Sequence, residues 1–169
     1  MKKHNLLHIS IATLLGFAAL STNSAAQQQN LKEQLVGAWT LVSSDLIDKD
    51  GTKAPDFGTN PKGIMIFDAT GKYAQILGQA NRPKLKASEN LRRDTPATEY
   101  GEAARGYAAA FGTWSVHEAD KTLIRRIEGA LIPNAEGRDA KASVSVASGE
   151  MKLSGTTSNV LKVEQVWKR

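Results

Sequence analysis

The stretch VGAWTLVSSD, residues 36–45, is the part of the sequence that decides the fold. Between Val36 and Ser43 the side chains alternate with a period of two, so that Trp39 and Leu41 fall on one face of an extended chain. β-Branched and aromatic residues in this pattern favour a β-strand. Two interpretations are open at this point: an ordinary strand, or the closed end of a small barrel.

Strand-like segments recur at regular spacing along the rest of the chain. KGIMIFD and KYAQILG, residues 62–68 and 72–78, form a hairpin around an Ala-Thr-Gly turn. Turn signals separate the further candidate strands, which span residues 36–43, 112–118, 121–131, 140–147, 150–156 and 160–168. Regularly spaced short strands predict an all-β meander that closes into a barrel or stacks as a sandwich.

One segment in the middle of the chain has helical features. Thr95 is a suitable cap, Pro96 suits the first helical position, and alanine-rich sequence continues to about Ala110. About eight strands and one inserted helix fit an antiparallel up-and-down β-barrel, whose interior accommodates packed side chains or one small ligand.

The N-terminal segment has the features of a secretion signal. Lys2 and Lys3 precede an apolar stretch from Leu6 to Leu20, and small residues up to Ala26 suit signal peptidase. A membrane anchor is the alternative, but this stretch is short for a bilayer. We expect cleavage between Ala26 and Gln27 and a periplasmic or secreted protein. Residues 27–34 would then form a flexible segment, and residues 35–169 the barrel domain.

Charge and cysteine content restrict the partners. The net charge of +5 falls to +3 without the signal, which contains two lysines and no acidic residue. This is a weak field for nucleic acid. The densest basic stretch, RPKLKASENLRRD at residues 82–94, is either a solvated loop or an electrostatic entrance for an anionic ligand. The chain has no cysteine, so neither disulfides nor lipid attached to cysteine contribute.

The sequence contains no recognisable catalytic or cofactor motif. Only His117 lies outside the predicted signal, so no histidine-containing metal cluster is expected. There is no Gly-x-Ser-x-Gly elbow and no phosphate-binding glycine loop. Apart from the signal, no apolar run is long enough to span a membrane as a helix. We therefore assign no catalytic residue, metal or cofactor and predict no integral membrane span, and the oligomeric state stays open.

Several segments together resemble the bacterial lipocalin-like domain family, a group of calycin-type small barrels. In order they are LVGAWTLVS, PKGIMIFDATGKYAQIL, NRP, GYAAAFGTWSV, KTLIRRIEGALIPNAEG and VWKR, spread over about residues 35–169. The Gly37-Ala38-Trp39 triplet is similar to the lipocalin Gly-x-Trp signature. The resemblance implies that Trp39 closes the barrel floor and that Arg169 packs over its ring as a cation, with Gly37 and Trp167 completing the closure.

The sequence departs from the family pattern at residues 125–128. Related sequences often have two histidines before a Val-Glu pair, whereas this chain has Arg125-Arg126-Ile127-Glu128. Arginine is permanently charged and replaces histidine neither as a base nor as a metal ligand. By period two, Arg125 and Arg126 fall on opposite faces. We expect Arg126 and Glu128 inside, where the carboxylate would pair with the guanidinium, with an exposed ion pair as the alternative.

The resulting functional prediction is a ligand-binding module. It places a small hydrophobic or amphipathic molecule, including an anionic one, in the barrel interior. The candidate ligand-binding residues are Tyr73, Tyr107, Phe111, Trp114, Arg126 and Glu128. An enzyme of isomerase, cyclase or hydratase type is one alternative, although the sequence favours a non-enzymatic protein, and a cavity-free barrel that binds a partner is the other.

Overall fold

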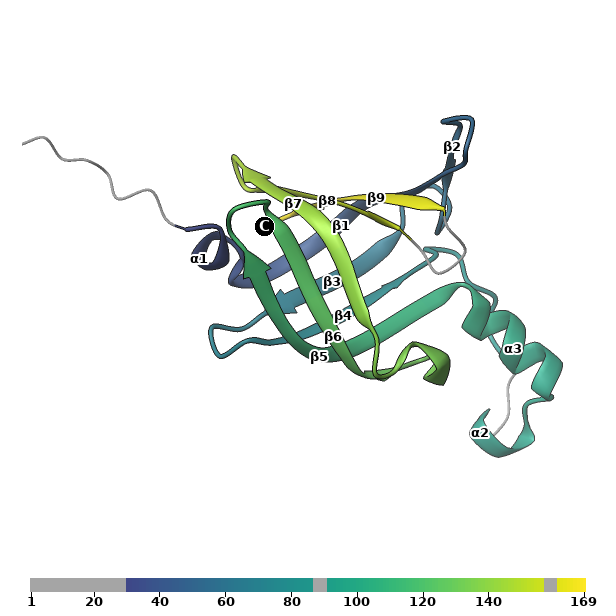
Figure 1. Cartoon of the computed structure of the whole chain (residues 1–169). Coiled ribbons are helices and arrows are strands. Elements are labelled where there is room, and N and C mark those ends of the chain that lie inside the picture. Colours follow the sequence, from purple (N-terminus) through teal and green to yellow (C-terminus); the bar gives the residue numbers. More distant parts are fainter. Residues whose placement is uncertain (1–29, 87–90, 157–160) are drawn as a thin grey trace, which may run out of the picture.

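The computed structural model describes residues 30–86, 91–156 and 161–169. The predicted signal, residues 1–26, lies outside this part of the chain, so its cleavage stays a prediction. Within the segment 27–34 that we expected to be flexible, Leu31 begins a one-turn helix, α1 (Leu31–Leu35). The remaining elements form a barrel with helices at both of its ends (Figure 1).

The strands follow the predicted order. They are β1 (Gly37–Ile47), β2 (Lys53–Pro55), β3 (Lys62–Phe67), β4 (Lys72–Gly78), β5 (Tyr107–His117), β6 (Thr122–Ala130), β7 (Asp139–Ala147), β8 (Glu150–Thr156) and β9 (Lys162–Lys168). Short helices α2 (Leu91–Asp94) and α3 (Ala97–Arg105) lie between β4 and β5, and a 3-10 turn, η1 (Pro133–Ala135), lies between β6 and β7.

Antiparallel pairing closes the sheet on itself. Consecutive strands pair from β3 to β9, and β1 pairs with both β3 and β9. The short β2 pairs with the end of β1 and lies outside the ring. This confirms the predicted all-β barrel of eight strands with a helix inserted in mid-chain.

One end of the barrel is closed by short turns and by α1. Trp39 is fully buried there, and its indole Nε1 donates a hydrogen bond to the Leu35 carbonyl at 2.8 Å. The Arg169 guanidinium lies 4.8 Å from the centroid of the Trp39 ring, which is the contact that the resemblance implies. Glu118, beyond the end of β5, accepts from the backbone N–H groups of Leu31 and Lys32 and so holds the start of α1. We call this the closed end.

The opposite end, which we call the open end, has longer connections and carries α3 (Figure 1). Here one sequence prediction is wrong in its extent: the helix ends at Arg105, and Tyr107–Ala110 belong to β5. Tyr107 pairs with Gly78 and Ala110 with Gln75 of β4. Pairing along a neighbouring strand therefore overrides the helix propensity of the three alanines.

The inward-facing side chains differ between the two halves of the barrel. The half near the closed end is filled by large buried residues: Trp39, Leu41, Met65, Phe67, Tyr73, Trp114, Leu123, Met151, Leu153 and Trp167. By strand alternation, the inner wall near the open end carries small residues: Ser44, Gly63, Ala108, Ala110, Ala130, Ala140 and Gly155. Except for Ser44, these small residues are partly exposed. The closed half is a packed core, whereas the inner wall of the open half carries mostly small, partly exposed side chains.

Candidate functional site

Arg125 is the arginine that faces the barrel interior. It pairs with Trp114 of β5, and its inward neighbours along β6 are the buried Leu123 and the half-buried Ile127. Arg126 faces outward: its side chain is 56% exposed and forms a 3.3 Å ion pair with Asp139. The prediction that Arg126 points inward is therefore wrong, and Arg125 takes the interior position.

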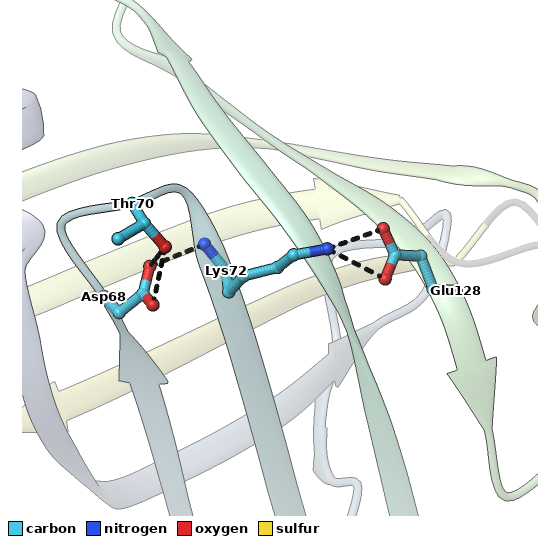
Figure 2. A network of polar contacts seen from close by, with 4 residues as sticks. All are labelled: Asp68, Thr70, Lys72 and Glu128. Carbon is cyan, nitrogen blue, oxygen red and sulfur yellow. Dashed lines mark hydrogen bonds and ion pairs between the residues drawn. The ribbon is translucent and has the colours of Figure 1, made fainter.

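Glu128 is also on the outside. Figure 2 shows its carboxylate at the Lys72 ammonium, 3.2 Å away, next to the turn in which Asp68 accepts from Thr70 and from the Lys72 backbone. The reason is a β-bulge, because Phe111 pairs with Gly129 while Gly112 pairs with Ile127. Glu128 is thus the extra residue of the bulge. The predicted inward pair of Arg126 and Glu128 does not form.

In the described part of the chain, the Arg125 guanidinium has a polar neighbour but no ion-pair partner. Arg125 Nη1 donates to the side-chain carbonyl of Gln75, which reaches across β5 from β4. Arg125 Nε is enclosed and has no hydrogen-bond partner among the described residues. Within the same part of the chain, no carboxylate forms an ion pair with Arg125, whereas Arg126 has one. Among the described residues, Arg125 is thus a cation inside the barrel without an ion-pair partner.

Tyr73 lies close to this cation. Burial raises the pKa of the Tyr73 hydroxyl, and the positive charge of Arg125 acts in the opposite direction. Burial also lowers the pKa of Arg125. β5 lies between the strands that carry Gln75 and Arg125, and its inward residues Ala110 and Gly112 are small. Tyr73, Gln75 and Arg125 form what we call the interior polar site.

The predicted aromatic lining divides into two pairs. Tyr73 and Trp114 are inside and buried, and both pack against Phe67, with ring centroids 6.4 Å and 4.9 Å apart respectively. Tyr107 and Phe111 are on the outer face instead, with Phe111 57% exposed. The expectation that these four rings line one interior cavity is therefore wrong for Tyr107 and Phe111.

A concavity that the sequence did not indicate lies on the outside of the barrel near the open end. It has a volume of about 1020 Å³ and lies between the outer faces of β3 and β4, the segment after β4, and α3. We call it the outer groove. Its lining includes Ile64, Ile76, Tyr100, Tyr107 and Leu131, together with the cations Lys62, Arg82 and Lys84. The basic stretch was the only sequence signal for this region.

Neither a metal cluster nor a membrane-spanning helix is present in the part of the chain that the structure describes. No three His, Cys, Asp or Glu side chains in residues 30–86, 91–156 and 161–169 lie close enough together to hold a metal ion. In the same residues no helix has the length and apolar character needed to cross a bilayer.

Comparison with known proteins identifies the family. The model of the lipocalin-like domain matches residues 36–169, which is the barrel and little else. Among solved structures, a redesigned beta barrel is 15% identical with a TM-score of 0.44, covering 84% of this chain and 96% of that one. A mutant of the fluorescent protein UnaG is 14% identical with a TM-score of 0.37, covering 81% of this chain and 96% of that one. No curated protein matches the sequence. On the extent of the domain match, the chain belongs to the lipocalin-like domain family.

Proposed function

We propose that the protein binds a small amphipathic molecule with an anionic group in the open half of the barrel. The anion would lie at the guanidinium of Arg125, with Gln75 and Tyr73 beside it. The apolar part would contact inner-wall residues such as Ala108, Ala110 and Leu77. Lipocalin-like barrels are suited to this role because eight strands enclose space for one small ligand.

The observation that carries the proposal is that Arg125 has no ion-pair partner among the residues the structure describes. Transferring an ionised group from water into a protein interior is costly unless an opposite charge and hydrogen bonds replace its hydration. Arg125 has one neutral partner, Gln75, and its enclosed Nε has none in the described part of the chain. A ligand carboxylate would supply both the countercharge and an acceptor, in the bidentate geometry that guanidinium favours.

The adjacent arginine provides a matched control for the test. Octanoate is a suitable probe because it combines a carboxylate with a short apolar chain, and calorimetric titration measures its Kd. We expect Arg125→Met to weaken octanoate binding by about 10- to 100-fold, since a charge-assisted hydrogen bond contributes about 1.5–3 kcal/mol. Arg126→Met makes the same chemical change on the outer face and should leave the Kd within about twofold.

A neutral probe separates charge recognition from packing. Octan-1-ol should bind the parent more weakly than octanoate does, and the Arg125→Met variant should bind both probes with similar affinity. Equal effects of the two methionine variants on octanoate binding would remove Arg125 from the site. Failure of octanoate to bind the parent at all would refute an interior site for amphipathic carboxylates.

A further inference from the structure

The floor of the outer groove is a row of exposed apolar side chains. Ile64 and Ile76 lie directly opposite each other in the β3–β4 register and are 42% and 41% exposed. Ala109 pairs with Ile76, and its carbonyl accepts from the backbone of Leu131, which is 40% exposed. The outward face of an antiparallel sheet in water is ordinarily polar. A contiguous apolar row on this face is typical of a binding surface.

The opposite outer face shows the ordinary pattern. Ser143 and Ser145 of β7 face outward opposite Ser154 and Lys152 of β8. The apolar row is therefore a local property of β3, β4 and the strands next to them. A general tendency of this barrel to expose apolar residues does not explain it.

Stacked side chains hold one wall of the groove in place. The Tyr107 ring lies directly over Gly78, because a Cβ added there would be 2.5 Å from the ring. On the Tyr107 ring lies the guanidinium of Arg82, 4.3 Å from the centroid. The Gln79 backbone donates to the Gly106 carbonyl at 2.9 Å, and Glu99 of α3 accepts from the Lys86 backbone at 2.6 Å. The groove is thus a preformed concave site.

The charges that line the groove have one sign. Lys62, Arg82 and Lys84 contribute to the lining, and none of the described lining residues is acidic. The basic stretch that begins at Arg82 thus lies beside an apolar floor. This combination is complementary to a molecule with an apolar chain and an anionic head, because the head gains the cations while the chain leaves water.

Charge disfavours two other occupants. Residues 1–29 of the chain contain Lys2 and Lys3 and no acidic residue, so this apolar segment would bring positive charge to a positive rim. A second copy in a two-fold arrangement would place the same surface against itself, and the three cations would face their equivalents. A concave groove also fits one alkyl chain better than it fits the flat surface of a membrane.

We infer that the outer groove is a second binding site, for one free long-chain amphiphile with an anionic head, such as a fatty acid. The chain lies along Ile64, Ile76 and Leu131, and the carboxylate lies near Arg82 and Lys84. The volume of about 1020 Å³ is at the upper end of the range of roughly 300–1,000 Å³ for small-molecule sites. This site goes beyond the proposed function because it is outside the barrel and does not involve Arg125.

Strand β3 supplies a matched pair of variants for the apolar floor. Ile64 lines the groove, whereas Ile66, on the same outer face and with the same 42% exposure, is absent from its lining. Binding of hexadecanoate below its micelle concentration is measured by equilibrium dialysis on the full chain. We expect Ile64→Asp to weaken binding by about tenfold or more, because the new charge would lie against the alkyl chain. Ile66→Asp should leave binding within about twofold.

A second pair of variants tests the cationic rim without touching the sheet. Lys84→Glu should weaken hexadecanoate binding, while Lys86→Glu, two residues further along and not part of the lining, should have a much smaller effect. These exposed positions tolerate substitution, so the rim pair remains informative if an isoleucine variant does not fold. A hexadecanoate with a photoreactive chain end should then crosslink to groove segments 62–64 and 76–85.

The variants also distinguish this inference from the proposed function. Arg125→Met should leave the hexadecanoate that is bound in the groove unaffected. The groove would be refuted if Arg125→Met abolished hexadecanoate binding while Ile64→Asp and Lys84→Glu left it unchanged. The interior site would then remain supported. Absence of hexadecanoate binding by the parent would overturn the inference. So would binding to phosphatidylglycerol vesicles without binding of the free acid, or dimerisation that Ile64→Asp abolishes without any bound acid.

Discussion

Trp39 connects three parts of the chain at the closed end. Its indole donates to Leu35 of α1, its ring is fully buried in the core, and the Arg169 guanidinium covers one of its faces. Arg169 also donates to the Gln34 carbonyl at 3.2 Å, so the same cation holds α1 against the ring. One tryptophan therefore joins the beginning of the barrel to its last strand.

We predict that the stabilities of Trp39 and Arg169 variants are coupled. Trp39→Ala should lower the free energy of unfolding by about 3–5 kcal/mol, as truncation of a buried aromatic residue does. Arg169→Ala should lower it by about 1 kcal/mol through the lost cation–π contact. Urea denaturation of the single and double variants gives the coupling energy. Lys168→Ala, at an exposed neighbour, is the control, and strictly additive losses would show that the cation does not stabilise the ring.

Asp56 introduces a pH dependence at the open end. It is half-buried, burial raises its pKa, and the hydrogen bond from the Ser44 hydroxyl at 3.5 Å only partly opposes this. The folded state therefore binds more protons than the unfolded state between the unfolded pKa of about 3.9 and the raised value. The free energy of unfolding falls as pH rises through this window. Above the window it stays at the lower value.

Replacing the Asp56 carboxyl should remove this loss of stability at neutral pH. We expect Asp56→Asn to be more stable than the parent at pH 7, because a neutral amide avoids burial of charge and its oxygen still accepts from Ser44. The advantage should shrink as pH falls through the window and the parent carboxyl becomes protonated. Urea midpoints at pH 7 and pH 3.5 measure it, and a difference that does not change with pH would contradict the assignment to ionisation.

The two adjacent arginines show the limit of sequence reasoning at the residue scale. Period two correctly placed them on opposite faces of one strand. The choice between the faces rested on a same-face carboxylate at Glu128, but a β-bulge moves Glu128 to the outer side, where it contacts Lys72. The correct interior residue, Arg125, has a neutral partner on another strand, and no local pattern indicates such a partner.

At the scale of the elements, Gly112 allows β5 and β6 to approach each other closely at the β-bulge. A Cβ at this position would lie 2.0 Å from the Arg126 carbonyl oxygen, so the close approach of the two strands at the bulge requires glycine. The bulge separates the inward Ile127 from Ala130, the next inward residue of β6. It therefore determines which residues of β6 face the interior polar site.

A comparison of two glycines tests this requirement. Gly112→Ala should destabilise the protein by about 1–3 kcal/mol or more, because backbone atoms must move to admit the methyl group. Gly101→Ala is the control: it lies in α3 with no atom within 4 Å of the added Cβ, so it should stabilise by about 0.5–1 kcal/mol through helix propensity. Thermal and urea unfolding of both variants measures the contrast. Opposite signs are expected, and a stabilised Gly112→Ala would show that the bulge tolerates a side chain.

The inserted segment shows why element boundaries were harder to predict than element types. The predicted start of α3 was one residue early: Ala97 is its first residue, Pro96 takes the N-cap position expected for Thr95, and no side chain caps the helix. The helix ends near Gly106, but alanines 108–110 have strong helix propensity and no strand pattern of their own. Their extended conformation comes from pairing with β4, residues distant in sequence. The hairpin of β3 and β4 was predicted well because its pattern and its turn are local.

At the scale of the whole molecule, the two ends of the barrel differ in what they do. The closed end combines short turns, buried large side chains and α1; the sequence indicated the closure by Trp39 and Arg169, but it predicted a flexible segment where α1 forms. The open end combines long connections, small inner residues and the outer groove. The groove was not predicted because it forms where residues 79–85 and α3 come to lie beside the outer faces of β3 and β4. The order of strands in the sequence does not encode that placement.

The pairing of β1 with β9 has a consequence for how the chain reaches this structure. Leu41 pairs in register with Trp167, so the first strand of the ring is completed only by the last. Closure therefore depends on contacts of high contact order, which makes folding slow compared with that of helical proteins. Until β9 docks, β1 presents an unpaired edge that can recruit a strand from another chain. The pairing that covers this edge in the finished protein thus leaves the incompletely folded chain open to strand pairing with other chains.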